Sequence, residues 1–151
     1  MAIVMVEEPF DGPTAAALID DVQQEYVLRY GGPDETPVDA SEFAPPDGAF
    51  LLALADGQPV GCVGLRRHDA TMAEIKRMYV PTAHRRRGFG RVLLRAAEER
   101  ARELGYTRIL LETGSKQPEA IALYTADGYR PVEGFGHYRC QPGSVSFAKE
   151  L

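Results

Sequence analysis

Residues 71 to 113 constrain the fold of this chain most strongly, because their hydrophobic periodicity changes twice. The runs TMAEIKRMYV (71–80) and TRILLET (107–113) are short and apolar, as is typical of strands. Between them, residues 88–104 predict a helix that ends at Gly105. Its expected buried side comprises Phe89, Val92, Leu93, Ala96, Ala97, Ala101 and Leu104. A strand, helix and strand of this length form a crossover unit, so the two strands should be parallel.

The segments on either side predict that more strands join the same sheet. Residues 49–67 contain two strand-like runs around Asp56-Gly57, a hairpin signal, so they should form an antiparallel meander with 71–80. Residues 2–6 predict a further strand. The tail from Tyr129 predicts one or two strands that end in SVSFAKEL.

Two more helices are expected, one early and one late in the chain. After the turn at residues 11–13, apolar side chains follow helical spacing until Gly31, and residues 118–127 predict a second helix. The expected buried positions of the first helix are Ala15, Leu18, Ile19, Val22 and Tyr26. We therefore expect an α/β fold with a mixed, twisted sheet, in a single domain spanning residues 1–151.

Composition excludes several classes of protein. The net charge of -5 argues against general binding to nucleic acid or to anionic membranes. No basic leader precedes an apolar core and no apolar run has membrane-spanning length, so we expect a soluble, cytoplasmic protein. Cys62 and Cys140 suit neither a disulfide framework nor a metal cluster, and we expect both to be buried or half-buried thiols.

One region of this acidic chain is strongly basic. Residues 76–95 hold seven cationic side chains and no acidic one: Lys76, Arg77, Arg85, Arg86, Arg87, Arg91 and Arg95. Within this region, RRRGFG lies between a strand and a helix, where backbone N–H groups and the helix dipole can bind an anion. The alternative is a tight turn beside solvated arginines. The spacing matches neither the dinucleotide GxGxxG fingerprint nor a P-loop.

In this context the sequence resembles the GCN5-related N-acetyltransferases. Their signature, [RQ]xxGx[GA] between a strand and a long helix, is matched by AEIKRMYVPTAHRRRGFGRVLLRAAEERARELGY, and AIALYTADGY resembles their downstream helix. The matching blocks cover residues 48–130. The resemblance implies a sheet that opens between residues 72–80 and 107–113 to admit acetyl-CoA, the co-substrate, and it implies no metal.

The resemblance also assigns cofactor contacts. Arg85, Gly88 and Gly90 occupy the signature positions of the pyrophosphate loop. The backbone of Arg86, Arg87, Phe89 and Arg91 completes that loop. The strand end that pairs with the pantetheine arm matches Met78, Tyr79 and Val80. Many relatives have Asn where this chain has Gln117, which retains the amide for a cofactor contact.

Two residues match catalytic positions of the family. Tyr124 matches a frequent general acid, which protonates the departing thiolate, and its alternative is a packed core tyrosine. Glu74 resembles the general base of histone-acetylating members. It could equally orient a water, face solvent, or pair with Lys76 or Arg66.

The acceptor is expected to be a small amine, because the chain is short and shows no added recognition domain. The resemblance implies that the first helix and the loop at 31–48 cover the acceptor, and we expect a carboxylate clamp of Arg29 and either Arg66 or Arg67 there. The expected pocket walls are Tyr26, Arg29, Tyr30 and Phe43. Two alternatives remain, a protein N-acetyltransferase and a non-catalytic acetyl-CoA-binding module, and the sequence leaves a homodimer open.

Overall fold

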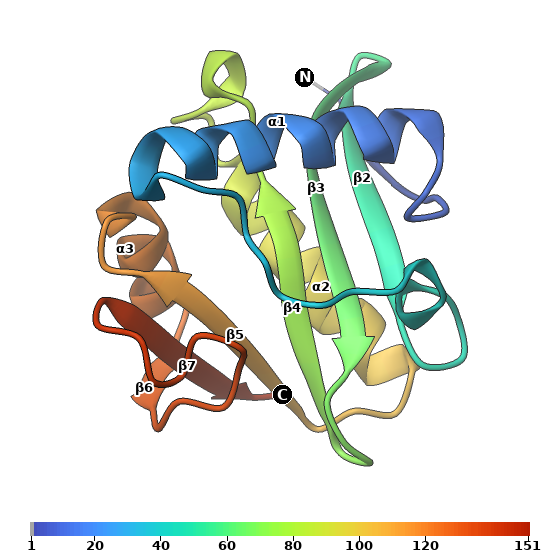
Figure 1. Ribbon diagram of the computed structural model, residues 1–151. Coiled ribbons are helices and arrows are strands. Elements are labelled where there is room, and N and C mark those ends of the chain that lie inside the picture. The colour runs from blue at the N-terminus through green and yellow to red at the C-terminus, as the bar shows by residue number, and fades with distance from the viewer. Residues whose placement is uncertain (1) are drawn as a thin grey trace.

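The computed structural model describes residues 2–151 and is built on one seven-stranded sheet with the order β1-β2-β3-β4-β5-β7-β6 (Figure 1). The strands are β1 (Ile3–Glu7), β2 (Ala49–Ala55), β3 (Gln58–Arg67), β4 (Met72–Tyr79), β5 (Arg108–Gly114), β6 (Arg130–Val132) and β7 (Ser144–Glu150). Only β4 and β5 are parallel neighbours, and all other pairs are antiparallel. The predicted mixed sheet, meander and parallel crossover are therefore confirmed.

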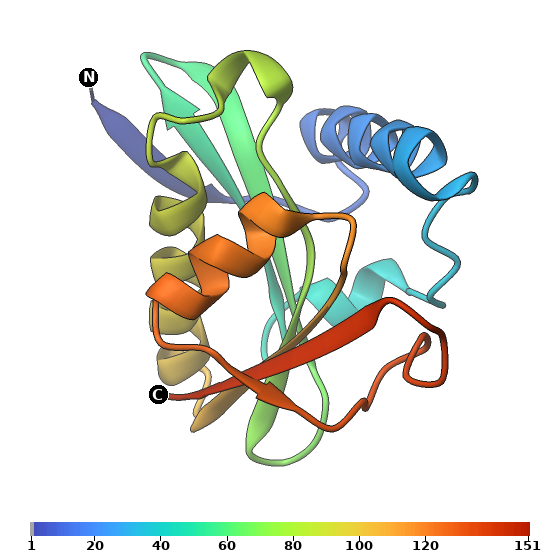
Figure 2. The ribbon, with the colours of Figure 1, turned by 90° about the vertical axis from the view of Figure 1, so that its left-hand side faces the viewer.

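Helices cover both faces of this sheet. One face carries α1, and the other carries α2 and α3 (Figure 2). The helices are α1 (Pro13–Tyr30), α2 (Phe89–Glu103) and α3 (Pro118–Ala126), with 3-10 turns η1 (Ala40–Phe43) and η2 (Thr82–His84). Gly31 ends α1 in the left-handed conformation at φ 81°, which glycine adopts without steric cost. Within residues 2–151, no helix combines the length and apolarity needed to cross a membrane.

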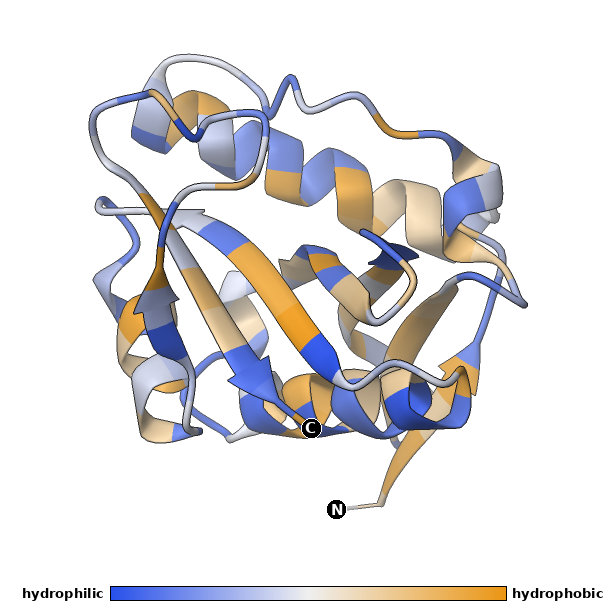
Figure 3. Ribbon diagram, turned by 90° about the horizontal axis from the view of Figure 1, so that it is seen from below, coloured by the Kyte–Doolittle hydropathy of each residue, from blue (hydrophilic) through white to orange (hydrophobic). Residues whose placement is uncertain are grey.

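Each face of the sheet has its own hydrophobic core. The central strands are mostly hydrophobic, whereas α1 and α2 alternate hydrophobic and hydrophilic residues (Figure 3). The α1 side buries Ala15, Leu18, Val22, Phe43, Phe50, Leu52, Cys62 and Tyr79. The α2 side holds the larger cluster, which includes Leu51, Val63, Ile75, Leu93, Ile109, Leu111 and Phe147. This division shows toward which face each strand residue points.

The structure corrects the predicted buried side of α2. Leu94 is buried and was not predicted, while Val92, Ala96 and Leu104 are only half-buried. Glu98 is also buried, because the Tyr129 hydroxyl donates to it at 2.9 Å and Lys149 Nζ lies 3.2 Å from it. A charged side chain with such partners can replace an apolar one on a buried face.

The two cysteines differ from each other. Cys62 is buried, as predicted, and its thiol donates to the Arg77 carbonyl at 3.3 Å. Burial raises the pKa of this thiol to about 12, so it stays protonated at neutral pH. Cys140 is exposed, so the prediction that it is buried or half-buried was wrong. It lies in the loop between β6 and β7, where no core is available to cover it.

The pairing of β4 with β5 covers only part of each strand. It runs from Met72–Arg108 to Ile75–Leu111 and then stops, although β4 continues to Tyr79. A β-bulge at Arg77, which has a positive φ of 58°, interrupts the pairing of β4 with β3 at the same level. The strands thus separate where β4 also changes direction.

Candidate active site

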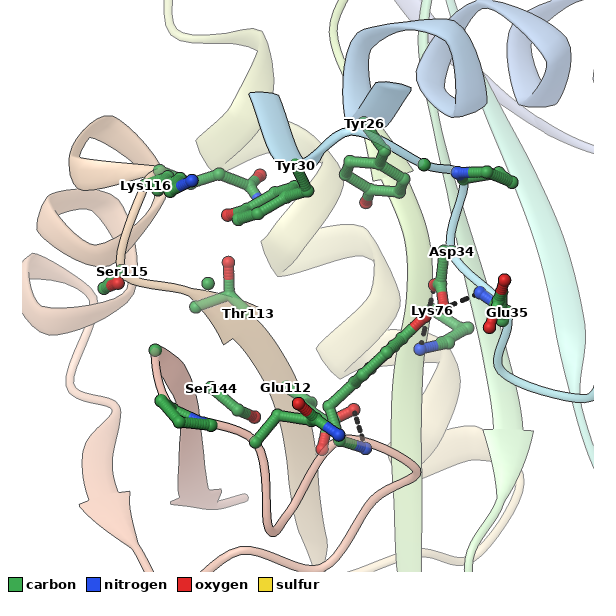
Figure 4. A pocket seen from close by; sticks show the side chains of 18 residues that line it. Tyr26, Tyr30, Asp34, Glu35, Lys76, Glu112, Thr113, Ser115, Lys116 and Ser144 are labelled. Atoms are coloured by element: carbon green, nitrogen blue, oxygen red, sulfur yellow. Dashed lines mark hydrogen bonds and ion pairs between the residues drawn. The ribbon is translucent and has the colours of Figure 1, made fainter. Parts of the chain in front are cut away.

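A cavity of about 400 Å³ lies beside this separation (Figure 4). Its walls come from the end of α1, the loop that follows α1, the middle of β4, the end of β5, and the loop between β6 and β7. The side chains that matter below are Tyr26, Tyr30, Asp34, Lys76, Glu112, Gln117 and Tyr138. A narrow extension of about 40 Å³ continues between β4 and β5, past Met78, Leu111 and Tyr124.

Two hydrogen bonds connect walls that are distant in sequence. The Glu35 backbone N–H donates to the Tyr138 hydroxyl at 2.6 Å, which joins the loop after α1 to the β6–β7 loop. On the other side, Gln117 Nε2 donates to the Tyr30 hydroxyl at 3.1 Å. The cavity is therefore bounded by chain segments that are tied to each other.

Asp34 fastens the loop after α1 to β4. Its carboxylate forms ion pairs with Lys76, at 3.2 Å, and with Arg77, and it accepts from the backbone and hydroxyl of Thr36. Burial alone would raise the pKa of Asp34, but Lys76, Thr36 and Arg77 together hold that pKa below its usual value. The loop is thereby held against the sheet by an ionised side chain.

Glu112 is a carboxylate of the cavity wall that the sequence reasoning missed. It lies on β5, one residue beyond the last residue paired with β4. Its Oε1 accepts only a long hydrogen bond of 3.5 Å from the Tyr138 backbone N–H, and its Oε2 has no partner among the described residues. Burial raises its pKa above the ordinary value for a glutamate. A strand residue of this kind gives no local signal, because β5 looks like any half-buried strand.

Tyr124 projects from α3 into the narrow extension between the strands. Its ring centroid lies 5.9 Å from that of Tyr129 and 6.1 Å from that of Phe147, so packing fixes the side chain. Burial raises the pKa of its hydroxyl to about 12. The hydroxyl therefore carries its proton at neutral pH, as a proton donor must.

Glu74 lies outside both cavities. It is buried, and its Oε1 accepts from Arg66 Nε at 2.9 Å. Arg66 Nη1 also contacts Glu42 Oε1 at 3.3 Å and donates to the Pro37 carbonyl at 2.9 Å. The pairing with Arg66, one of the alternatives for Glu74, is therefore the one that the structure contains.

The expected acceptor residues divide into two groups. Tyr26 and Tyr30 line the cavity, whereas Arg29, Phe43, Arg66 and Arg67 do not. Phe43 is buried and stacks on Phe10 with ring centroids 4.4 Å apart. Arg29 pairs with Glu119 at 2.6 Å, and Arg67 with Asp47 at 3.7 Å. Intramolecular partners thus occupy the predicted carboxylate clamp.

The N-terminus of α2 fits an anionic group. Gly88 precedes the helix at φ 83°, no side chain caps it, and Arg86 and Arg87 beside it are exposed. The first N–H groups of a helix have no intrahelical partner, so an uncapped end offers them to an anion. Glycine at position 90 leaves room for Leu123, because a Cβ there would lie 3.0 Å from Leu123 Cδ2.

Other residues of this segment act within the protein. Arg85 Nε donates to the Val80 carbonyl at 2.8 Å, and Arg85 Nη2 contacts Glu25 at 2.5 Å. Phe89 is buried in the core of the α2 side, and Arg91 pairs with Asp127 at 3.3 Å. Backbone groups and the exposed arginines, rather than the Arg85 side chain, are therefore free to meet a ligand. No cluster of three or more potential metal ligands occurs within residues 2–151.

A mixed sheet that opens between two parallel strands, next to an uncapped helix N-terminus, defines the class of acyl-CoA-dependent transferases. The profile of the Acetyltransferase (GNAT) family matches residues 16–129. This chain belongs to that family and is an N-acetyltransferase.

Individual relatives cover nearly the whole chain. An IAA acetyltransferase of Azospirillum brasilense is 34% identical over 135 residues, which are 89% of this chain and 88% of the relative. A Klebsiella pneumoniae structure assigned to the acyl-CoA N-acyltransferases is 31% identical, with a TM-score of 0.82 over 99% of this chain and 97% of its own. A GNAT acetyltransferase of Elizabethkingia anophelis, solved with acetyl-CoA bound, shares the fold at 18% identity, with a TM-score of 0.70 over 99% and 98% of the two chains.

Proposed function

We propose that this enzyme transfers the acetyl group of acetyl-CoA directly to the amine of a small molecule, with both substrates bound at once. The observation that carries this proposal is the cavity of about 400 Å³, bounded by linked segments and continuous with the gap between β4 and β5. Its volume is within the range of roughly 300–1,000 Å³ that is typical of small-molecule sites.

Acetyl-CoA is proposed to bind with its pyrophosphate at residues 85–91 and its pantetheine arm along Met78 to Val80. The uncapped end of α2 and the exposed arginines support the first contact, because they offer N–H donors and positive charge. The interrupted pairing of β4 supports the second, because a strand that has lost its neighbour has backbone groups to offer. Gln117 is proposed to contact the arm from the start of α3.

The proposed chemistry uses the same gap. The neutral amine attacks the thioester carbonyl, and a backbone N–H of Met78 or Tyr79, at the bulge, stabilises the negative charge on its oxygen. Tyr124, protonated and packed in the extension, donates a proton to the departing thiolate. Glu74 was the expected base, but its place beside Arg66 leaves it only a role through an intervening water.

The acceptor is proposed to carry an anionic group as well as its amine. Lys76 and Lys116 line the cavity, and since Lys76 is paired with Asp34, Lys116 is proposed to take the place of the expected arginine clamp. Tyr26 and Tyr30 offer apolar ring faces to the rest of the molecule. The Azospirillum brasilense relative is named as an acetyltransferase of IAA rather than of a protein, which supports a small acceptor.

A turnover screen tests this function. Acetyl-CoA is mixed with amino acids, simple amines, peptides with free N-termini and a folded protein, and thiol release is followed. Acetylation of one or more small amines is the expected result. Acetylation of peptides or proteins alone would contradict the proposal, and CoA binding without any turnover would favour a regulatory module.

A further inference from the structure

We propose that the Glu112 carboxylate accepts the proton that the acceptor's ammonium group must lose before it attacks the thioester. The inference rests on the proposed function and adds the proton acceptor to it. Four features of Glu112 carry it: its position, its lack of a partner, the charges around it, and its access to the cavity.

The sheet register places Glu112 at the point where the strands separate. Glu74 is paired with Leu110, and Ile75 with Leu111, so Glu112 is the next residue of β5. Leu111 belongs to the core of the α2 side, so strand alternation directs Glu112 toward the opposite face, which carries α1 and the cavity. Lys76 lines the cavity from β4, and its positive charge acts on Glu112 (Figure 4).

Glu112 also differs from Glu74 in its hydrogen bonding. Glu74 Oε1 already accepts a hydrogen bond from Arg66 Nε at 2.9 Å. Among residues 2–151, Glu112 has no ion-pair partner, and only the long contact from Tyr138 reaches its Oε1. A Cβ on Gly136 would lie 2.5 Å from Oε2, so the glycine there leaves room for the carboxylate.

The charges around Glu112 suit proton transfer. Burial has the largest influence and raises the pKa of Glu112. Lys76 and the Tyr138 N–H lower that pKa, whereas the negative charges of Glu74 and Asp34 raise it further. A carboxylate with a raised pKa is a stronger base at neutral pH. Lys76 and Lys116 also line the cavity, and a positive charge beside the acceptor favours the neutral form of an amine.

The proton balance is closed by groups already described. The ammonium gives one proton to Glu112, and the neutral amine then forms the C–N bond while the C–S bond breaks. The thiolate gains a proton from Tyr124, and the second proton that the nitrogen loses as the amide forms restores the Tyr124 hydroxyl through solvent. Glu112 returns its proton to solvent between turnovers, so each cycle releases one proton in total.

The activity test compares Glu112→Gln with Glu133→Gln, which removes an exposed carboxylate outside the cavity. With any acceptor that the screen identifies, Glu112→Gln should lower kcat by about 10²-fold or more at neutral pH and abolish the acid limb of the pH–rate profile. CoA binding, followed by thermal shift, should be unchanged. A Glu112→Gln enzyme that keeps the limb and the rate of Glu133→Gln would overturn the proposal.

A second readout needs no acceptor, so it separates this proposal from the proposed function. Carbon-13 NMR of glutamate-labelled protein follows each carboxyl through a pH titration, and the signal missing from Glu112→Gln is that of Glu112. It should titrate above the ordinary glutamate value of about 4.3. Titration at or below that value would overturn the proposal even if the enzyme acetylates amines.

Discussion

The Asp34 carboxylate and the Lys76 ammonium lie 3.2 Å apart and join the loop after α1 to the middle of β4. Arg77, the residue with positive φ at the bulge, binds the same carboxylate. Asp34 therefore holds the loop that bounds the cavity and also fixes the position of Lys76 in the cavity wall. This arrangement makes the shape of the acceptor pocket depend on ionisation as well as on packing.

Asp34→Asn should destabilise the protein by about 3–5 kcal/mol at neutral pH, because it leaves two buried cations without their counter-ion. The pKa of Asp34 is lowered on folding, so its contribution is fully present above the unfolded value of about 3.9 and is lost as pH falls through the folded value. Urea unfolding at several pH values should therefore show the two proteins converging in acid. A constant difference at every pH would contradict the ionic account.

Gly88→Glu should abolish binding of CoA, because a carboxylate would occupy the anion site at the start of α2. Gly57→Glu is a matched control: Gly57 also has a positive φ, 80°, with no atom within 4 Å of its would-be Cβ, but it lies in the β2–β3 turn. Calorimetric titration should detect binding only in the control. Gly90→Glu should also abolish binding. If Gly88→Glu or Gly90→Glu bound CoA with wild-type affinity, the start of α2 would not be the pyrophosphate site.

Tyr124→Phe should keep CoA affinity and lower the rate of the chemical step by roughly 10²-fold, the scale of a lost general acid. The ring contacts with Tyr129 and Phe147 survive this change. Tyr106→Phe is its control, because that buried hydroxyl donates to the Asp47 carbonyl at 2.6 Å, away from the cavity. An unchanged single-turnover rate in Tyr124→Phe would show that Tyr124 is a packed core residue and not the proton donor.

Glu74→Gln should act mainly on stability. It weakens the contact with Arg66, whose guanidinium keeps Glu42 and the Pro37 carbonyl, so we expect a loss of about 1–3 kcal/mol. The acid limb of the pH–rate profile should persist. Loss of that limb in Glu74→Gln, with the limb intact in Glu112→Gln, would establish Glu74 as the base.

Replacement of residues 34–42 by a Gly/Ser linker should raise the KM for the acceptor by at least about tenfold while CoA still binds. The physical reason is that the loop supplies Asp34 and Glu35 to the cavity, and that its Glu35 backbone N–H donates to the Tyr138 hydroxyl. Steady-state kinetics with varied acceptor measure this effect. Wild-type KM and kcat in the linker variant would exclude the loop from recognition.

Local patterns in the sequence were sufficient to predict the strands, the helices and the parallel crossover. The apolar runs around Asp56-Gly57 and the helix that starts after Gly88 depend on neighbours within a few residues, so periodicity and turn residues reveal them. The family signature was equally local. The family and the fold class are accordingly confirmed.

The composition of the cavity could not be predicted in the same way. Glu112 and Tyr138 meet because β7 pairs with β5, and no short segment encodes that encounter. The bulge at Arg77 was likewise missed, because arginine gives no sign of a positive φ. Phe43 was expected to line the pocket, but its ring stacks on Phe10 instead.

The limited pairing of β4 with β5 has a mechanical consequence. β4 is paired with β5 only along a short segment, from Met72–Arg108 to Ile75–Leu111, which we call the seam. In contrast, β5 is paired with β7 along its whole length. Beyond that seam the gap separates β4 from β5, and with them the two parts of the sheet, β1 to β4 and β5, β7 and β6. A ligand that contacts both β4 and β5 holds the two parts together. Amide hydrogen exchange should therefore slow on both sides of the seam when CoA binds, far beyond the atoms that the ligand contacts.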